Sequence, residues 1–394
     1  MLRIFNPFIL NFSTMPFLKK VLNGLFGNHA YGHEPDKKLI IIAGIIIVFG
    51  LIMLSSATSA AAYQKYGSSY YFLNHQLFGV FIGLIGFWYF SKNDYHRWRK
   101  KALWFLFFSI VLLLLVFITA LSAKYGSSRS WINIFGFSLQ PSEFVKLSFL
   151  LYLSAWLEKR RTKLGELSEG IGPFVFVLGI IAVLMLLQPD LGTLAIITVT
   201  SLIVYYVGGG KLKHVLIIIL IGFIAMGVMM RLKPYQADRF KCFFNSNIGA
   251  SSECYQVNQS LIAVGSGGIF GRGFGESRQK YMYIPEVESD FIFSIICEEL
   301  GLVFSSLLTG LFIFLFYRGC QIAKNAPDNF GRLLAIGISS WIAVQAVVNI
   351  SGIINLMPMT GVPLPLISYG GSAMLASLSA LGVLVNISRQ TRLR

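Results

Sequence analysis

The carboxylate of Asp290 stands where the sequence changes from polar to apolar, a place at which it could do chemistry. It ends the segment Pro285-Glu286-Val287-Glu288-Ser289-Asp290 and directly precedes Phe291-Ile292-Phe293. Such a carboxylate can cap the helix that follows or act as a general base. Partial loss of water would raise its pKa and a helix N-terminus would lower it, so both roles stay open.

Glu143 and Lys146 form a second charged pair beside apolar sequence, in Gln140-Pro141-Ser142-Glu143-Phe144-Val145-Lys146. Pro141 is typical of a first helical turn, and a spacing of three residues places both charges on one helix face. Ionisable residues at membrane depth are costly and are therefore candidates for function. The alternative is a structural ion pair that lets both charges tolerate burial.

Other polar residues lie at the ends of apolar segments or inside them. Asp190 lies in a very short connection after Pro189 and is expected to cap the next helix. Glu298 and Glu299 lie about two turns inside an apolar segment, where we expect structural pairing across a bundle. Ser368 and the glycines after it predict a broken helix that lines a cavity, which suits a transporter as well as an enzyme.

Long apolar runs indicate which elements must position these residues. Hydrophobic residues make up 55% of the 394-residue chain, and charged residues only 13%. A helix of roughly 20 apolar residues crosses a bilayer, and lipid leaves no alternative to helices for such runs. The sequence therefore predicts an all-α polytopic membrane protein with about ten transmembrane helices. The predicted spans are 39–58, 72–91, 102–122, 142–158, 172–188, 193–208, 214–231, 291–317, 333–356 and 366–388.

The distribution of Lys and Arg predicts how these spans are oriented. Both residue types gather in the loops after the second, fourth and sixth spans, which are cytoplasmic by the positive-inside rule. Both termini are then cytoplasmic, and one long loop, 232–290, lies on the outer face between the seventh and eighth spans. The net charge of +16 is divided among short loops, which argues against nucleic-acid binding. We divide the chain into a basic amphipathic tail, 1–37, and a transmembrane domain, 38–390.

The long outer loop contains two of the four cysteines. Cys242 and Cys254 are close in sequence and face an oxidising compartment, which predicts a disulfide; two free thiols are the alternative. Cys297 and Cys320 lie elsewhere and are expected to be inert packing residues. The apolar pattern of Val257 to Val264, followed by a glycine-rich stretch, predicts a short helix and then a turn.

Several motifs occur in a fixed order along the chain. They are Ser128 to Ile132, Gln140 to Lys146, Gln188 to Thr193, Tyr255-Gln256 with Gln259-Ser260, Gly265 to Gly268, Gln279-Lys280, Pro285 to Phe293, Glu298 to Gly301 and Ile367 to Ser372. Together they resemble the SEDS family (shape, elongation, division and sporulation), which polymerises lipid II into glycan strands. The resemblance runs from the first span to the last and is closer to the division branch than to the elongation branch.

The resemblance implies roles for individual residues. Asp290 matches the family's essential acid and is the expected catalytic general base. Glu143 and Lys146 match the charged pair that the family places in a cavity beneath the outer face. The further residues implied as contacts of the diphosphate or sugar are Arg129, Arg239, Gln279, Lys280 and Ser368.

The expected function is that of an inverting peptidoglycan glycosyltransferase at the outer face of the bacterial cytoplasmic membrane, at the division septum. The expected partners are lipid II, a lipid-linked glycan strand, a class B penicillin-binding transpeptidase and other division proteins. No cofactor is certain; a divalent cation such as magnesium or manganese could help the diphosphate to leave, although no His or Cys cluster has ligand spacing. A lipid II flippase and a non-catalytic division scaffold are the alternatives.

Overall fold

The computed structural model describes residues 34–118, 122–125, 128–134, 137–161, 164, 166–232, 234–244 and 252–391. Most of the predicted N-terminal tail lies outside these residues. Every predicted span overlaps one helix of the structure. These helices are α2 (Lys37–Tyr66), α3 (Tyr71–Lys92), α4 (Tyr95–Leu115), α5 (Pro141–Lys159), α6 (Gly172–Leu187), α7 (Leu191–Val207), α8 (Leu212–Leu232), α11 (Ile292–Asn325), α12 (Asn329–Ile353) and α13 (Gly371–Arg389).

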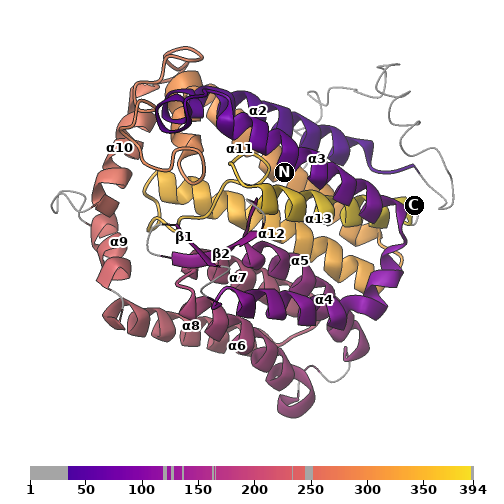
Figure 1. Ribbon diagram of the computed structural model, residues 1–394. Helices are drawn as coiled ribbons and strands as arrows, with labels where there is room; N and C mark the ends of the chain where they lie inside the picture. Colours follow the sequence, from indigo (N-terminus) through magenta and orange to yellow (C-terminus); the bar gives the residue numbers. More distant parts are fainter. Residues whose placement is uncertain are drawn as a thin grey trace, which may run out of the picture.

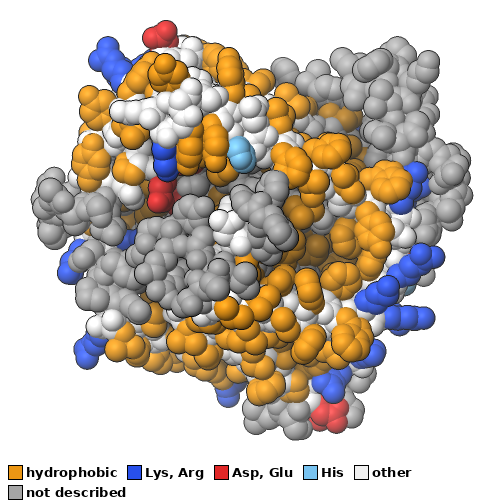
Figure 2. Space-filling view, in the orientation of Figure 1, with side chains coloured by type: hydrophobic (Ala, Val, Ile, Leu, Met, Phe, Trp, Pro, Cys, Tyr) orange, Lys and Arg blue, Asp and Glu red, His pale blue; other side chains and the backbone are white. Residues whose placement is uncertain are grey.

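The membrane character of the chain is plain from these helices. Seven helices of the described chain are long and apolar enough to cross a bilayer, and α7 is a shorter apolar helix. The helices α4 and α5 coincide with predicted spans but also carry charged residues. Hydrophobic side chains cover much of the face in Figure 2, while Lys and Arg lie mainly toward its margins. The chain is therefore a multi-pass membrane protein; the count of ten spans and their orientation stay predictions.

The helices α3 and α13 pack closely against each other at glycine residues. A Cβ on Gly79 of α3 would lie 2.9 Å from the Cα of Gly371, and a Cβ on Gly382 of α13 would lie 2.5 Å from the carbonyl oxygen of Phe87. Glycine at these positions lets the two backbones approach closely, a common device where lipid gives no hydrophobic drive to helix association. The pair α3 and α13 lies side by side through the bundle (Figure 1).

The helix α11 differs from the single uninterrupted span that we predicted at 291–317. It is broken at Gly301, whose φ of 74° lies in the left-handed region that favours glycine. The break frees backbone groups on both sides, and the glycine-rich segment that follows α10 (Ser252–Ser266) satisfies them. The pairs are Arg272 N with Glu298 O, Gly273 N with Glu299 O, Leu302 N with Gly268 O, and Val303 N with Ile269 O, at 2.9 to 3.2 Å.

The segment before α5 corrects the all-helical prediction in one detail. It forms a three-stranded antiparallel sheet of β1 (Ser122–Tyr125), β2 (Ser128–Ile134) and β3 (Phe137–Leu139), in the order β1-β2-β3. A segment too short for another helix pairs its backbone groups with one another instead. The prediction of a mainly helical fold stands around this sheet.

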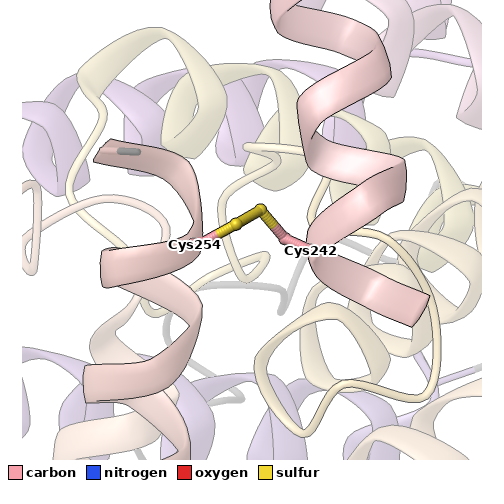
Figure 3. The surroundings of a disulfide bond; sticks show 2 residues. All are labelled: Cys242 and Cys254. Carbon is pink, nitrogen blue, oxygen red and sulfur yellow. A yellow bond between two sulfur atoms is a disulfide. The ribbon is translucent and has the colours of Figure 1, made fainter. Parts of the chain in front are cut away.

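The first part of the long outer loop contains two helices among its described residues. After α8 the chain forms α9 (Pro234–Phe244), and α10 includes the short helix predicted at 257–264. Both run across the bundle's helix axes at one end, opposite the end at which the C-terminus lies (Figure 1). The predicted disulfide between Cys242 and Cys254 is present and joins α9 to α10, with the two Cα atoms 5.2 Å apart (Figure 3). Cys297 and Cys320 are free, as expected.

Candidate functional site

Asp290 does not cap the helix that follows it. The residue at the N-cap position of α11 is Phe291, and no side chain accepts a hydrogen bond from the first turn. The Asp290 backbone N–H donates instead to the carbonyl oxygen of Glu286, at 3.3 Å, and the Ser289 hydroxyl donates to the same carbonyl oxygen at 3.2 Å. Of the two roles that the sequence left open, the geometry favours the base.

The surroundings of Asp290 suit a proton acceptor at neutral pH. Burial raises the pKa of Asp290 to about 7, and the negative charges of Glu286 and Glu288 raise it as well, whereas the positive charge of Arg239 and the neighbouring Ser289 hydroxyl lower it. Burial also raises the pKa of Glu288. A general base works best when its pKa lies near the working pH, because a large fraction of it is then deprotonated and it is still basic enough to accept a proton.

Three segments meet at the Asp290 carboxylate. Arg239 comes from α9, and Gly361 comes from the loop between α12 and α13. A Cβ built on Gly361 would lie 3.3 Å from Asp290 Oδ2 and 3.6 Å from Arg239 Nη1. Gly361 also has a φ of 68°, which favours glycine. The absence of a side chain at this position thus leaves open the space in which the carboxylate and the guanidinium approach each other.

Two buried amides on α12 hold the loop that contains Gly361. Asn349 Nδ2 donates to the carbonyl oxygens of Val362 and Asp290, each at 2.8 Å. Gln345, one turn earlier on the same face, donates from Nε2 to the carbonyl oxygen of Pro363 at 2.9 Å. The loop and the residue at the start of α11 are therefore fixed to one helix.

The same face of α12 reaches the predicted pair in α5. Lys146 Nζ donates to Glu143 Oε1 at 2.7 Å and to Gln345 Oε1 at 2.9 Å, and it lies 5.0 Å from the centroid of the Trp341 ring. Glu143 and Lys146 are only 1% and 2% exposed. The geometry thus favours the structural ion pair over an open contact surface, and it links that pair to the Asp290 region through Gln345 and Asn349.

Lys280 lies in a separate buried cluster. Its Nζ is 3.0 Å from Glu299 Oε1, and Ser56 Oγ donates to the same carboxylate at 2.8 Å. Glu298 accepts hydrogen bonds from Ser277 Oγ and from the backbone N–H of Gln279. The structural pairing expected for Glu298 and Glu299 is confirmed, and it occupies the ammonium group of Lys280, whose side chain is 4% exposed.

The remaining residues that the sequence singled out lie in different environments. Ser368 is buried; its hydroxyl accepts from the backbone N–H of Leu364 at 2.8 Å, and its carbonyl oxygen accepts from Gln76 Nε2 at 3.0 Å. The side-chain oxygen of Gln279 is buried without a hydrogen-bond partner among the described residues. Arg129 lies in β2, but its side chain is outside the described part of the structure. Asp190 caps α7, as expected, by accepting from the backbone N–H of Thr193 at 3.2 Å.

The described residues contain no group of three or more His, Cys, Asp or Glu side chains that could hold a metal ion. The acidic residues near Asp290 are thus not arranged as a protein cage for a cation. A magnesium ion usually needs few protein ligands when a diphosphate supplies the others.

Three residues of the site were missed from the sequence: Gln345, Asn349 and Gly361. A signal for the first two was present, because Trp341, Gln345 and Asn349 recur every four residues on one face of a mainly apolar helix. Polar amides on one face of a membrane helix indicate partners in the bundle. Nothing in the sequence indicated that a Cβ at Gly361 would approach the carboxylate, since that contact depends on the tertiary structure.

Comparison with known proteins matches one family over most of the chain. A family model described as "Cell cycle protein", for FtsW, RodA and SpoVE, matches residues 36–393. Stage V sporulation protein E of Bacillus subtilis is 37% identical over 359 residues, which cover 91% of this chain and 98% of that protein. A probable peptidoglycan glycosyltransferase FtsW of Trichlorobacter lovleyi is 38% identical over 363 residues, which cover 91% of this chain and 94% of that protein.

Two solved structures share the fold. A chain from a peptidoglycan synthase complex that coordinates polymerization and crosslinking has a TM-score of 0.74 at 26% identity, covering 92% of this chain and 98% of that one. The rod shape determining protein RodA of Thermus thermophilus has a TM-score of 0.68 at 26% identity, covering 93% of this chain and 100% of that one.

Proposed function

This chain belongs to the FtsW, RodA and SpoVE family of cell cycle proteins and is a peptidoglycan glycosyltransferase, and we propose that it polymerises lipid II with Asp290 as the general base. The observation that supports this role most strongly is the position of Asp290. It does not cap a helix, it lies beside a guanidinium, and burial raises its pKa to about 7.

The proposed reaction needs one base. Asp290 accepts the proton of a sugar hydroxyl on the incoming lipid II as the hydroxyl oxygen attacks the anomeric carbon of the growing strand. The bond from that carbon to the diphosphate breaks, and the diphosphate leaves with its lipid still in the bilayer. The configuration at the anomeric carbon is inverted, because the oxygen attacks from the face opposite the leaving group. No second carboxylate acting as an acid is required, unlike in inverting hydrolases.

The leaving diphosphate gains negative charge in the transition state, so a cation must stabilise it. Arg239 is the cation best placed for this, because it already adjoins Asp290 at Gly361 and its side chain is partly exposed. Arg129 remains a second candidate. A magnesium or manganese ion, if one takes part, would arrive with the diphosphate. Lys146 and Lys280 are buried in ion pairs and act by holding the structure.

The proposal also includes the cellular location of the protein and its protein partner. The FtsW relatives and the likeness to a chain of a peptidoglycan synthase complex support an assignment to the division septum of the bacterial cytoplasmic membrane. We assign a class B penicillin-binding transpeptidase as the partner, because polymerised strands must be cross-linked.

Polymerisation of purified lipid II tests the proposal and separates it from the flippase and scaffold alternatives. The wild-type protein, with and without the transpeptidase, should give a ladder on a glycan-length gel, and folded Asp290→Ala should give none. Polymer from both proteins would remove Asp290 from its role. No polymer from the wild type, together with Asp290-dependent movement of lipid II across vesicle membranes, would instead support a flippase.

A further inference from the structure

We propose that Asn349 of α12 is a positioning residue for the reaction, which holds the Asp290 peptide and the Gly361 loop in one fixed relation. This inference rests on the proposed function of Asp290 and goes beyond it. Asn349 touches neither the carboxylate nor any group assigned to substrate; it acts through the backbone.

The hydrogen bonds of Asn349 carry the inference. An amide nitrogen has two hydrogens, and both are used: one on the carbonyl oxygen of Asp290 and one on that of Val362, each at 2.8 Å. The opposite orientation of the amide would place its oxygen against two carbonyl oxygens, so the contacts themselves fix the orientation. The side chain is 1% exposed, so bulk solvent does not compete for these two hydrogen bonds.

The hydrogen bonds of Asn349 connect two segments that lie beside the Asp290 carboxylate. They join Asp290, two residues before the start of α11, to Val362, which follows Gly361, and Gly361 is the position at which Asp290 and Arg239 approach each other. Gln345 fixes the next carbonyl of the same loop, that of Pro363. A shift of the loop toward Asp290 would close the space, and a shift away would admit water to the carboxylate.

The side-chain oxygen of Asn349 is a second, independent observation. It is buried with no hydrogen-bond partner among the described residues, so this side chain keeps two donated bonds while its acceptor stays unsatisfied. Among the described residues, the Asn349 side chain is therefore held by its two donated hydrogen bonds alone.

The test uses the full chain, with Asn349→Ala compared with the wild type and with Val347→Ala, a substitution on the exposed face of the same helix. For Asn349→Ala we expect kcat for lipid II polymerisation to fall about 10- to 100-fold, because a small misplacement of a catalytic group has effects of that size. The KM should stay within about twofold, because the substrate contacts are intact. Val347→Ala should match the wild type in both.

The pH profile gives a readout that a merely structural role would not move. The groups that act on the Asp290 carboxylate are Arg239 of α9 and Glu286, Glu288 and Ser289 of its own loop. Freed from Asn349, the carboxylate should gain water, and the acidic limb of the kcat profile should move to lower pH. A folded Asn349→Ala protein with a wild-type rate overturns the inference, and so does a slow one whose profile is unmoved.

Folding is checked by thermal unfolding of the purified protein. If Asn349→Ala does not fold, Asn349→Ser decides, because its single hydroxyl can hold one of the two carbonyls and should give an intermediate loss of kcat. Wild-type rate and profile in Asn349→Ser would overturn the inference. If Asp290→Ala still polymerises lipid II, it is the proposed function that fails, whatever the Asn349 variants do.

Discussion

Arg239 and Asp290 approach each other against the backbone of Gly361, although the three residues come from α9, the start of α11 and the loop after α12. In the reaction proposed above, the two residues have different tasks. The base removes a proton from the attacking hydroxyl, while the cation stabilises charge on the group that leaves.

Removing the charge of Arg239 should change both the rate and its pH dependence. The guanidinium lowers the pKa of Asp290, so in Arg239→Gln that pKa rises and the acidic limb of the kcat profile moves to higher pH. We also expect kcat to fall by about 100-fold, because a group that stabilises transition-state charge is lost. Arg239→Lys keeps the charge and is the matched control. An unmoved profile in Arg239→Gln would argue against electrostatic contact between the two residues.

The ionised carboxylate of Asp290 should destabilise the folded protein at alkaline pH. Its pKa of about 7 in the folded state lies above the ordinary value of 3.8, so the folded state binds the proton more tightly and stability falls as pH rises from about 4 to 7. Asp290→Asn should therefore melt at a higher temperature than the wild type at pH 8, with the gap narrowing toward pH 5. Glu276→Gln, at an exposed carboxylate, is the control. An equal gap at both pH values would contradict the raised pKa.

The pair of Glu143 and Lys146 should behave as a coupled unit. Lys146→Met leaves a buried carboxylate without its cation and should destabilise the protein by about 3 to 5 kcal/mol. The double variant Glu143→Gln with Lys146→Met should lose less than the sum of the two single variants. Thermal unfolding of the three proteins measures this, and strictly additive losses would show that the two residues are not coupled.

The disulfide between α9 and α10 predicts a defined thiol count and an effect on the site. The denatured protein should expose two alkylatable thiols, Cys297 and Cys320, and four after reduction. Replacing Cys242 and Cys254 by serine should lower stability by about 3 kcal/mol. It should also lower kcat, because Arg239 lies on the same short helix as Cys242. Four thiols before reduction would exclude the bond.

Much of the fold could be predicted from the sequence because lipid imposes one rule. Apolar runs long enough to cross a bilayer must be helices, so each predicted span falls on a helix. The break at Gly301 was not predicted, because the glycine-rich segment that satisfies its freed backbone groups lies earlier in the chain. The small sheet before α5 was missed for a related reason: short strands give little signal between long apolar helices.

The site could be predicted only in part. The position of Asp290 before an apolar segment made it a candidate cap or base, and the resemblance to the SEDS family implied the base; the disulfide was predicted because both cysteines lie close together in one outer loop. The sequence did not indicate that Lys280 pairs with Glu299, or that Asn349 reaches the Asp290 backbone. Those contacts depend on which helices become neighbours, and residue type and spacing do not determine that.

The rate of lipid II polymerisation against pH, measured for the wild type and for folded Asp290→Ala, tests the central claim most directly. The account predicts that wild-type kcat rises through a single ionisation near pH 7, and that Asp290→Ala makes no polymer above background at any pH. Polymerisation by Asp290→Ala with the same pH profile as the wild type would contradict it, because another group would then be the base.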